Sequence, residues 1–282
     1  MDIFKSCSAL ENQLKKFKKN HFLIGFVPTM GALHKGHISL VERSVQENDF
    51  TIVSIFINPT QFNNEHDLKT YPNNLKKDIF LLKNISNKII VFNPTVKEIY
   101  SGNIKRENFK FQTLVKHMEG KYRPGHFMGV ATIINKLFSI ISADKVYFGE
   151  KDFQQIRVIE HLTNNRKFSV KIIRCKTVRH RSGLAYSSRN SKLDYSSKKI
   201  AANLFKALNF AKQNFEKFDI IKINSMCLNI ISKYPEINVE YFTIADENNL
   251  IPAKQKQKGV KYRAFIAAYV FGVRLIDNLE LN

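Results

Sequence analysis

The chain has 282 residues, of which 44% are hydrophobic and 24% are charged, with a formal net charge of +21. It is long enough for one large α/β domain or for one domain with a smaller second lobe. No apolar run reaches the 18 residues typical of a membrane-spanning helix, and Cys7, Cys175 and Cys227 show neither a disulfide framework nor CxxC spacing. The Lys-rich residues 1–19 lack the apolar segment of a secretory signal. These features predict a cytoplasmic protein.

The positive charge is weak evidence for a nucleic-acid-binding module. Lysines account for 34 of the 45 basic residues and are scattered along the whole chain. Net charge reports little about fold or function by itself, so a solvated surface is the favoured interpretation. Binding to RNA or DNA would have to be tight and steeply dependent on salt. We therefore expect no nucleic-acid partner and no membrane partner.

Apolar runs and helical periodicity alternate regularly through residues 1–176. The pattern predicts strands at 22–27, 50–57, 88–92, 145–148 and 170–174, and helices at 36–47, 73–83, 126–141 and 152–164. The run at 50–57 is almost continuously apolar, as in a parallel strand that is covered on both faces. This alternation indicates a Rossmann-like, doubly wound parallel sheet, with the loops after its strands gathered at one edge.

The pattern changes near Lys176. Helices are predicted at 197–212 and 220–233 and strands at 239–244 and 265–270, separated by a Lys- and Gln-rich loop at 253–261. No βαβ unit is evident in this part. We therefore expect a Rossmann-like domain over 1–176 and a smaller α+β lobe over 177–282 that acts as a lid.

The most informative segment is Pro28–His37, which directly follows the first long strand. It carries Gly31 and Gly36, and it places His34 and His37 three residues apart at the start of a helix. Glycines allow close backbone approach, a helix N-terminus attracts phosphate, and imidazoles can stabilise a developing phosphoryl charge. A zinc site would need a third ligand, and an ordinary pair of helix-start histidines is the other alternative. The segment favours a site for a nucleotide triphosphate.

Four later segments carry compatible chemistry, and we expect all of them at strand ends. They are Asn58–Phe62, Glu119–Phe127, Phe148–Gln155 and Gly183–Asn190. Each could be an ordinary turn or a charged helix start by itself. Amides suit a hydroxy acid, Arg123 could clamp a carboxylate, and Lys151 could follow phosphate charge through a reaction. Their recurrence favours binding of a carboxylate together with a nucleotide.

The chain resembles the pantoate–β-alanine ligase (pantothenate synthetase) family, in order and spacing, over the segments Pro28–His37, Asn58–Phe62, Arg123–Lys136, Phe148–Gln155 and Gly183–Asn190. The closing segment Arg274–Asn278 is also similar, so the resemblance covers nearly the whole chain. It implies an ATP-dependent ligase that condenses pantoate with β-alanine to pantothenate, a precursor of coenzyme A. A pantoyl adenylate would form first, with release of pyrophosphate, and the amine of β-alanine would then displace AMP.

The resemblance also implies a role for each matching residue. His37 would be the proton donor, with His34 and Lys151 acting beside it on the phosphates. Gln61 and Gln155 would bind pantoate, and Gln61 would also border the β-alanine site. ATP would be bound by Met30, Gly31, Ala32, Leu33, His34, Lys35, Gly36, His37, Gly149, Glu150, Lys151, Asp152, Val178, Tyr186, Ser187, Ser188 and Arg189.

Further expectations concern the metal, the assembly and two departures from the family pattern. Mg²⁺ is expected with ATP and a homodimer is implied, but no metal ligand is assigned. Asp78 lies where a metal-associated carboxylate would be sought, although binding through ATP oxygens alone is equally possible. Tyr186 stands where the family usually has Met, and Met128 replaces a commonly basic residue. A nucleotidyl transferase of the same architecture that acts on a phosphate ester remains the alternative enzyme, although its pocket would need more arginine.

Overall fold

The computed structural model describes residues 1–282, which separate into two compact units. Unit 1 comprises residues 1–110, 123–149 and 158–176, and unit 2 comprises residues 111–122, 150–157 and 177–282. The chain passes from unit 1 to unit 2 for the last time between residues 176 and 177, where the sequence pattern changes. The segments 111–122 and 150–157 group with unit 2 although they lie earlier in the chain. Each unit is therefore built from discontinuous parts of the sequence.

Unit 1 contains a six-stranded parallel sheet in the order β1-β4-β3-β2-β5-β6. Its strands are β1 (Ile3–Phe4), β2 (Ile24–Thr29), β3 (Phe50–Ile55), β4 (Ile89–Phe92), β5 (Lys145–Gly149) and β6 (Lys171–Cys175). The chain winds outward from β2 through β3 to β4 and then resumes on the other side of β2 at β5. This order confirms the doubly wound sheet expected from the sequence, and it puts the switch point between β2 and β5.

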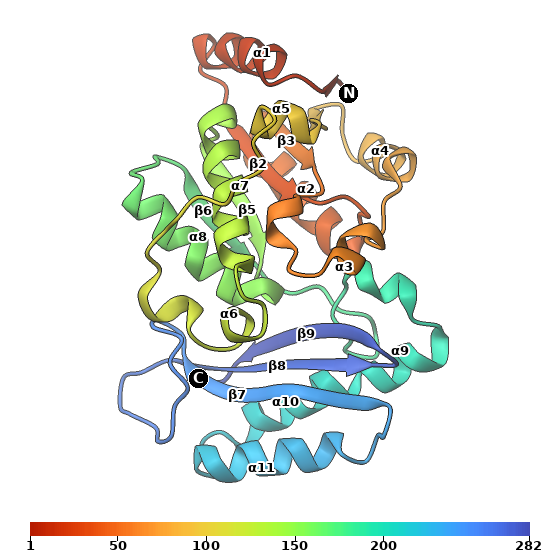
Figure 1. The fold of residues 1–282 in the computed structure, drawn as a ribbon, viewed down its shortest axis with the longest axis vertical. Coiled ribbons are helices and arrows are strands. Elements are labelled where there is room, and N and C mark those ends of the chain that lie inside the picture. Colours follow the sequence, from red (N-terminus) through yellow and green to blue (C-terminus); the bar gives the residue numbers. More distant parts are fainter. The chain divides into compact units, whose positions relative to one another are not determined.

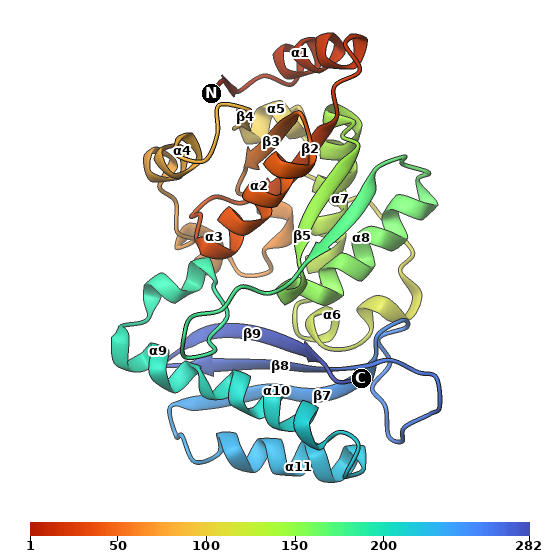
Figure 2. The ribbon, with the colours of Figure 1, turned by 180° about the vertical axis from the view of Figure 1, so that it is seen from behind.

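Helices cover this sheet on both sides (Figures 1 and 2). The helices of unit 1 are α1 (Cys7–Lys19), α2 (Lys35–Glu47), α3 (Glu65–Lys69), α4 (Leu75–Lys83), α5 (Val96–Tyr100) and α7 (His126–Ile141), with the short 3₁₀ turn η1 (Pro59–Gln61), and the five-residue α3 buries no side chain. Helix α8 (Phe153–Asn165) begins in unit 2 and continues into unit 1. No helix of either unit combines the length and the apolar character needed to span a bilayer.

Neighbouring residues of β2 assign α7 and α2 to opposite faces of the sheet. The Phe26 ring lies 6.5 Å from the Phe138 ring of α7, whereas Val27 shares a buried cluster with Leu40 and Val41 of α2. Successive side chains of a strand point to opposite faces, so the two helices lie on opposite sides. All of these side chains are less than 9% exposed. Burial on both faces explains why β2 and β3 read as continuous apolar runs.

Unit 2 is built on an antiparallel sheet in the order β7-β8-β9. Its elements are η2 (Gln112–Val115), α6 (Glu119–Tyr122), η3 (Glu150–Asp152), η4 (Ser188–Lys192), α9 (Tyr195–Ala201), α10 (Asn203–Asn214), α11 (Ile220–Ile231), β7 (Ile237–Asp246), β8 (Tyr262–Val270) and β9 (Val273–Glu280). Buried alanines and isoleucines of α10, α11 and β8 form its core. The expected α+β lobe is confirmed in its class.

Two details of unit 2 differ from the sequence prediction. The single helix expected over 197–212 is wrong, because the chain breaks at Ala202 into α9 and α10. The Asn203 side chain donates to Ile200 O there, and such side-chain bonds compete with regular helix. Strand β9 was not predicted, because its polar residues Asp277 and Asn278 interrupt the apolar alternation.

Gly25 of β2 packs closely against the buried polar side chains of Ser44 and Asn48. Ser44 Oγ shares a hydrogen bond with Thr51 Oγ1 at 2.8 Å, and Asn48 Nδ2 donates to Tyr147 Oη at 2.8 Å. A Cβ on Gly25 would overlap Ser44 Oγ and lie 2.5 Å from Asn48 Nδ2. These contacts explain why a glycine occupies the middle of an otherwise bulky strand.

We predict that Gly25→Ala lowers the free energy of unfolding by about 1–3 kcal/mol, because overpacking displaces the polar cluster. Urea denaturation measures the change. Gly149→Ala is the matched control, since a Cβ at that strand end would meet no atom within 4 Å. Equal stability of the two variants would contradict the packing argument.

Candidate active site

The loop after β2 is held in a tight turn by a carboxyl group from another helix. Gly31 has φ +82° and Ala32 has φ +49°, so two successive residues lie in the left-handed region. Asp78 of α4 accepts from Ala32 N at 2.9 Å and from Leu33 N at 2.7 Å. These bonds occupy both oxygens of a side chain that is 1% exposed. Asp78 therefore anchors the loop of which Met30 is the first residue.

The protonation of Asp78 reflects two opposing effects. Burial raises the pKa of the Asp78 carboxyl, while the N–H groups of Leu33 and Ala32 oppose that rise. Each oxygen accepts one backbone N–H, and the metal-associated role that its position in the sequence allowed stays a prediction. The structure contains no cluster of three or more His, Cys, Asp or Glu side chains arranged to hold a metal.

His34 and His37 come together at the start of α2. Their rings stack with centroids 4.0 Å apart and an interplanar angle of 22°. His34 is the N-cap residue of the helix, and its Nδ1 accepts from Gly36 N at 3.1 Å. Since Nδ1 is the acceptor, a neutral His34 carries its proton on Nε2. Two imidazoles at a helix N-terminus can donate hydrogen bonds to an anion.

Gln61 lies at the end of η1, the turn that follows β3. Its side chain is 8% exposed, and its Nε2 lies 2.7 Å from Met30 Sδ. The structure thus brings together the first two segments that the sequence singled out. Asn58, the cap residue of η1, donates through Nδ2 to Gln61 Oε1 at 3.2 Å. This bond leaves Gln61 Nε2 as the end of the amide directed toward Met30.

Tyr100 of α5 orients the Asn58 amide in turn. The Tyr100 hydroxyl donates to Asn58 Oδ1 at 2.5 Å, and Thr60 Oγ1 donates to the same atom at 3.0 Å. Burial raises the pKa of Tyr100, so the phenol remains a donor at neutral pH. Tyr100 was not predicted from the sequence, because its 42-residue separation from Asn58 leaves no local signal.

The backbone of η1 is fixed through three successive carbonyl groups. Arg106 donates to Thr60 O at 2.7 Å and to Phe62 O at 3.1 Å. His126 Nδ1 lies 2.8 Å from the intervening Gln61 O, which makes Nδ1 the protonated nitrogen. Gly129 of α7 permits this packing, since a Cβ there would lie 2.5 Å from Gln61 N. The position of Gln61 is therefore set by α7 and by the loop that contains Arg106.

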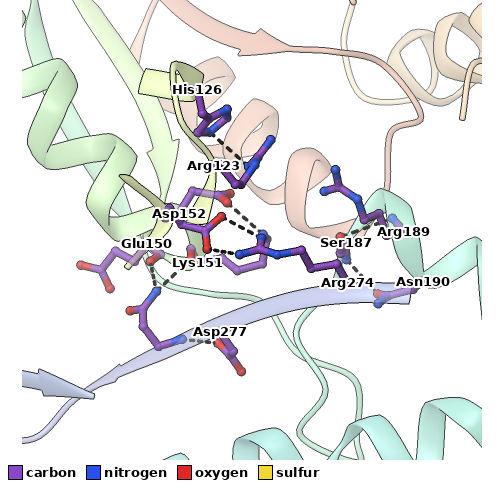
Figure 3. A network of polar contacts seen from close by, with 12 residues as sticks. Arg123, His126, Glu150, Lys151, Asp152, Ser187, Arg189, Asn190, Arg274 and Asp277 are labelled. Carbon is purple, nitrogen blue, oxygen red and sulfur yellow. Dashed lines mark hydrogen bonds and ion pairs between the residues drawn. The ribbon is translucent and has the colours of Figure 1, made fainter. Parts of the chain in front are cut away.

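Arg123 lies three residues before the first residue of α7 and contacts this network through His126. Its Nη1 lies 3.2 Å from His126 Nε2 (Figure 3). The expectation that its loop follows a strand is wrong, because the preceding elements are η2 and α6. Short polar turns before a helix read alike in sequence whether a strand or a helix precedes them. Arg123 supports a residue that in turn holds Gln61.

Lys151 lies on the turn η3 in unit 2. Its Nζ is 3.0 Å from Asp152 Oδ1, and its side chain is 17% exposed (Figure 3). The adjacent glutamines of α8 have different surroundings. Gln154 is 4% exposed and donates to Leu114 O and His117 O, whereas Gln155 is partly exposed. Gln154 therefore has a structural role, and Gln155 is the one available to a ligand.

The remaining nucleotide candidates gather on a hairpin and its following turn in unit 2. Tyr186 N donates to Val178 O at 3.1 Å, and the Tyr186 ring stacks on His180 at 3.8 Å. Ser187 caps η4 by accepting from Arg189 N, while Ser187 N donates to Asn190 Oδ1 at 2.8 Å (Figure 3). Val178, Tyr186, Ser187, Ser188 and Arg189 thus form one local group.

A doubly wound parallel sheet with a helix N-terminus at its switch-point strand is the architecture of nucleotide-binding α/β enzymes. The pantoate-beta-alanine ligase family model matches residues 2–280 of the chain. The chain is 44% identical over 282 residues to pantothenate synthetase of Flavobacterium psychrophilum, with 100% of both chains covered. It is 45% identical over 282 residues to pantothenate synthetase of Christiangramia forsetii, again with full coverage of both. The chain belongs to the pantoate–β-alanine ligase family.

Solved structures agree with this assignment. Pantothenate synthetase from Thermus thermophilus superposes with a TM-score of 0.91 at 34% identity, covering 100% of this chain and 99% of that one. Pantoate-beta-alanine ligase from Francisella tularensis, complexed with beta-gamma ATP and beta-alanine, superposes with a TM-score of 0.82 at 38% identity. That match covers 99% of this chain and 97% of the other.

We predict that Asp78→Asn lowers the free energy of unfolding by about 1–3 kcal/mol, since one buried backbone N–H would face an amide NH₂ instead of an oxygen. Urea denaturation of unmodified protein and variant gives the difference. Glu42→Gln, an exposed carboxylate change on neighbouring α2, should shift stability by less than about 0.5 kcal/mol. Indistinguishable variants would show that Asp78 does not hold the loop.

Proposed function

We propose that the chain catalyses the ATP-dependent condensation of pantoate with β-alanine through a pantoyl adenylate, releasing pyrophosphate and then AMP. The observation that supports this most is the meeting of Met30 and Gln61 at the edge of the sheet in a chain whose whole length matches the family. The ATP and β-alanine named for the Francisella relative agree with two of the three substrates.

The first step joins two anions, which repel each other in water. A carboxylate oxygen of pantoate attacks the α-phosphorus of ATP, and the bond from that phosphorus to the pyrophosphate oxygen breaks. Lys151 offsets charge on the phosphates, and His34 donates from Nε2 to a phosphoryl oxygen. His37 gives a proton to the departing pyrophosphate. Met30 to His37, Gly149 to Asp152, Val178 and Tyr186 to Arg189 line the ATP site in this proposal.

The second step makes the amide bond. The neutral amine of β-alanine attacks the acyl carbon, the bond to the AMP oxygen breaks, and the nitrogen loses a proton. Gln61 and Gln155 hold pantoate through its hydroxyl and carboxyl groups, because an amide both donates and accepts. Gln61 also borders the β-alanine position. Fixed amides reduce the entropy lost when the two reactants are brought together.

Mg²⁺ enters this proposal as part of the nucleotide substrate. Both Asp78 oxygens accept hydrogen bonds from backbone N–H groups. The other side chains proposed for the site are mainly histidines, lysine, arginine and glutamine amides. The ion would therefore be held by triphosphate oxygens rather than by a carboxylate cluster. A cytoplasmic homodimer, as the resemblance implies, completes the proposal, and light scattering coupled to size-exclusion chromatography measures its assembly.

Exchange of labelled pyrophosphate into ATP tests the first step without the second. We expect exchange that requires pantoate, proceeds without β-alanine, and stops short of AMP release. His37→Ala should reduce it about 100-fold, the usual scale for a group that stabilises developing charge. Formation of ADP, or exchange that is independent of pantoate, would favour the alternative transferase and reject this function.

Gln155→Ala should raise the KM for pantoate about tenfold, because one hydrogen-bonding group of roughly 1.4 kcal/mol is lost. The KM for ATP should stay within about twofold, and steady-state kinetics with each substrate varied in turn measures both. Gln154→Ala is the matched control, since its amide binds Leu114 O and His117 O. That control should lower stability without a pantoate-specific effect. A KM change of equal size for both substrates would contradict the role of Gln155.

A further inference from the structure

The backbone of the turn that carries Lys151 is held by one buried side chain. Asn278 Nδ2 of β9 donates to Glu150 O at 2.9 Å and to Lys151 O at 2.8 Å. The two bonds use both hydrogens of the amide and satisfy two consecutive carbonyl groups of η3. All of these atoms belong to unit 2. The origin of the Lys151 side chain is therefore fixed relative to β9.

The orientation of the Asn278 amide is itself determined. Arg263 of β8 donates from Nη1 to Asn278 Oδ1 at 2.7 Å, so the opposite end of the amide must present its hydrogens to the turn. Arg263 is held by Glu247, whose Oε1 accepts from Nε at 2.7 Å. The Asn278, Arg263 and Glu247 residues are 3%, 5% and 9% exposed. Burial strengthens each bond and makes an alternative orientation costly.

Arg263 also supports the start of α8, directly after the turn. Its guanidinium lies 4.0 Å from the centroid of the Phe153 ring, and Phe153 packs 6.0 Å from Phe265. Residues 150–153 are thus held from β8 and β9 on both sides of Lys151. Figure 3 shows Glu150, Lys151 and Asp152 together on this turn.

The Asn278 side chain is not needed for the strand in which it lies. Asn278 lies opposite Phe265 in the β8–β9 ladder, which pairs through backbone groups. The Asn278 backbone N–H donates to Asp277 Oδ1. Asp277 has a separate partner, because Arg179 Nη2 donates to Asp277 Oδ1 at 2.9 Å. What the amide alone supplies is a pair of donors for η3. No other residue type of this size presents two N–H groups together with an acceptor.

We propose that Asn278 is a positioning residue that sets the backbone of Lys151 for contact with the phosphates of ATP. This inference rests on the proposed role of Lys151 in the ligase reaction. Loss of the two donors lets the turn shift, and displacements of about 1 Å can reduce catalysis about 100-fold. The effect passes through Lys151, because Asn278 itself faces backbone carbonyl groups and Arg263.

The test is a double-mutant cycle between Asn278 and Lys151, read out as kcat and as KM for ATP. Asn278→Asp keeps the size and the acceptor for Arg263 but removes both donors. We expect it to lower kcat/KM for ATP at least about tenfold in the otherwise unmodified enzyme. In a Lys151→Ala background the same change should alter the rate less than about twofold, because the group that Asn278 positions is gone.

A control and a second variant keep the outcome decisive. Asn203→Ala removes another buried asparagine amide, from α10, and should lower the melting temperature without changing KM for ATP. Asn278→Ser replaces Asn278→Asp in the cycle if the latter does not fold. If Lys151→Ala is impaired but the Asn278 variants have normal kcat and KM for ATP, the inference about Asn278 is wrong while the proposed role of Lys151 stands. Normal rates of Lys151→Ala would instead reject the proposed role of Lys151. Additive effects across the cycle would make Asn278 merely structural.

Discussion

Parallel pairing of β2 with β3 is the constraint on which the candidate site of unit 1 depends. The register runs without interruption from Ile24 opposite Phe50 to Thr29 opposite Ile55. Both strands therefore end at the same edge of the sheet, and the loops that follow begin side by side. The contact between Met30 Sδ and Gln61 Nε2 is a direct consequence. Without this register, the turn after β2 and the Gln61 amide would not lie next to each other.

Buried side chains then fix the polar groups of these loops. Asp78 holds the turn after β2, Tyr100 and Asn58 orient the Gln61 amide, and Arg106 with His126 secures the backbone beneath it. Asn278 supports Lys151 in the same way within unit 2. Each case satisfies backbone or amide groups that would be costly to bury unpaired. The candidate site residues are consequently held in place by other parts of the protein, and charge stabilisation in a reaction requires groups that are oriented in advance.

Local sequence patterns predicted five of the six strands of the unit 1 sheet, and missed only the two-residue strand β1. Helix α7 begins at His126 and ends at Ile141 as its apolar periodicity indicated, and the doubly wound class is confirmed. Strand β9 and the break at Ala202 escaped prediction because polar residues there serve distant or side-chain partners. Local periodicity records only which face of an element is buried.

The contacts that support the site could not have been found from the sequence, although Asp78 and the segment Arg274–Asn278 were noted there for other reasons. Asp78 lies 45 residues from Leu33, Tyr100 lies 42 from Asn58, and Asn278 lies 127 from Lys151. Such pairs depend on the register of the sheets rather than on any motif, so the sequence did not show that Asp78 anchors the loop after β2. His34, His37 and Gln61 could be proposed as site residues from the sequence, because they lie in short local motifs next to predicted strand ends.

The central claim is that a pantoate carboxylate oxygen attacks the α-phosphorus of ATP. Turnover of pantoate labelled with ¹⁸O in its carboxyl group, in the presence of ATP and β-alanine, tests this claim most directly. The account predicts that one labelled oxygen of each pantoate converted appears in AMP, as detected by mass spectrometry, with none in pyrophosphate. Label in pyrophosphate or inorganic phosphate, or unlabelled AMP, would contradict it.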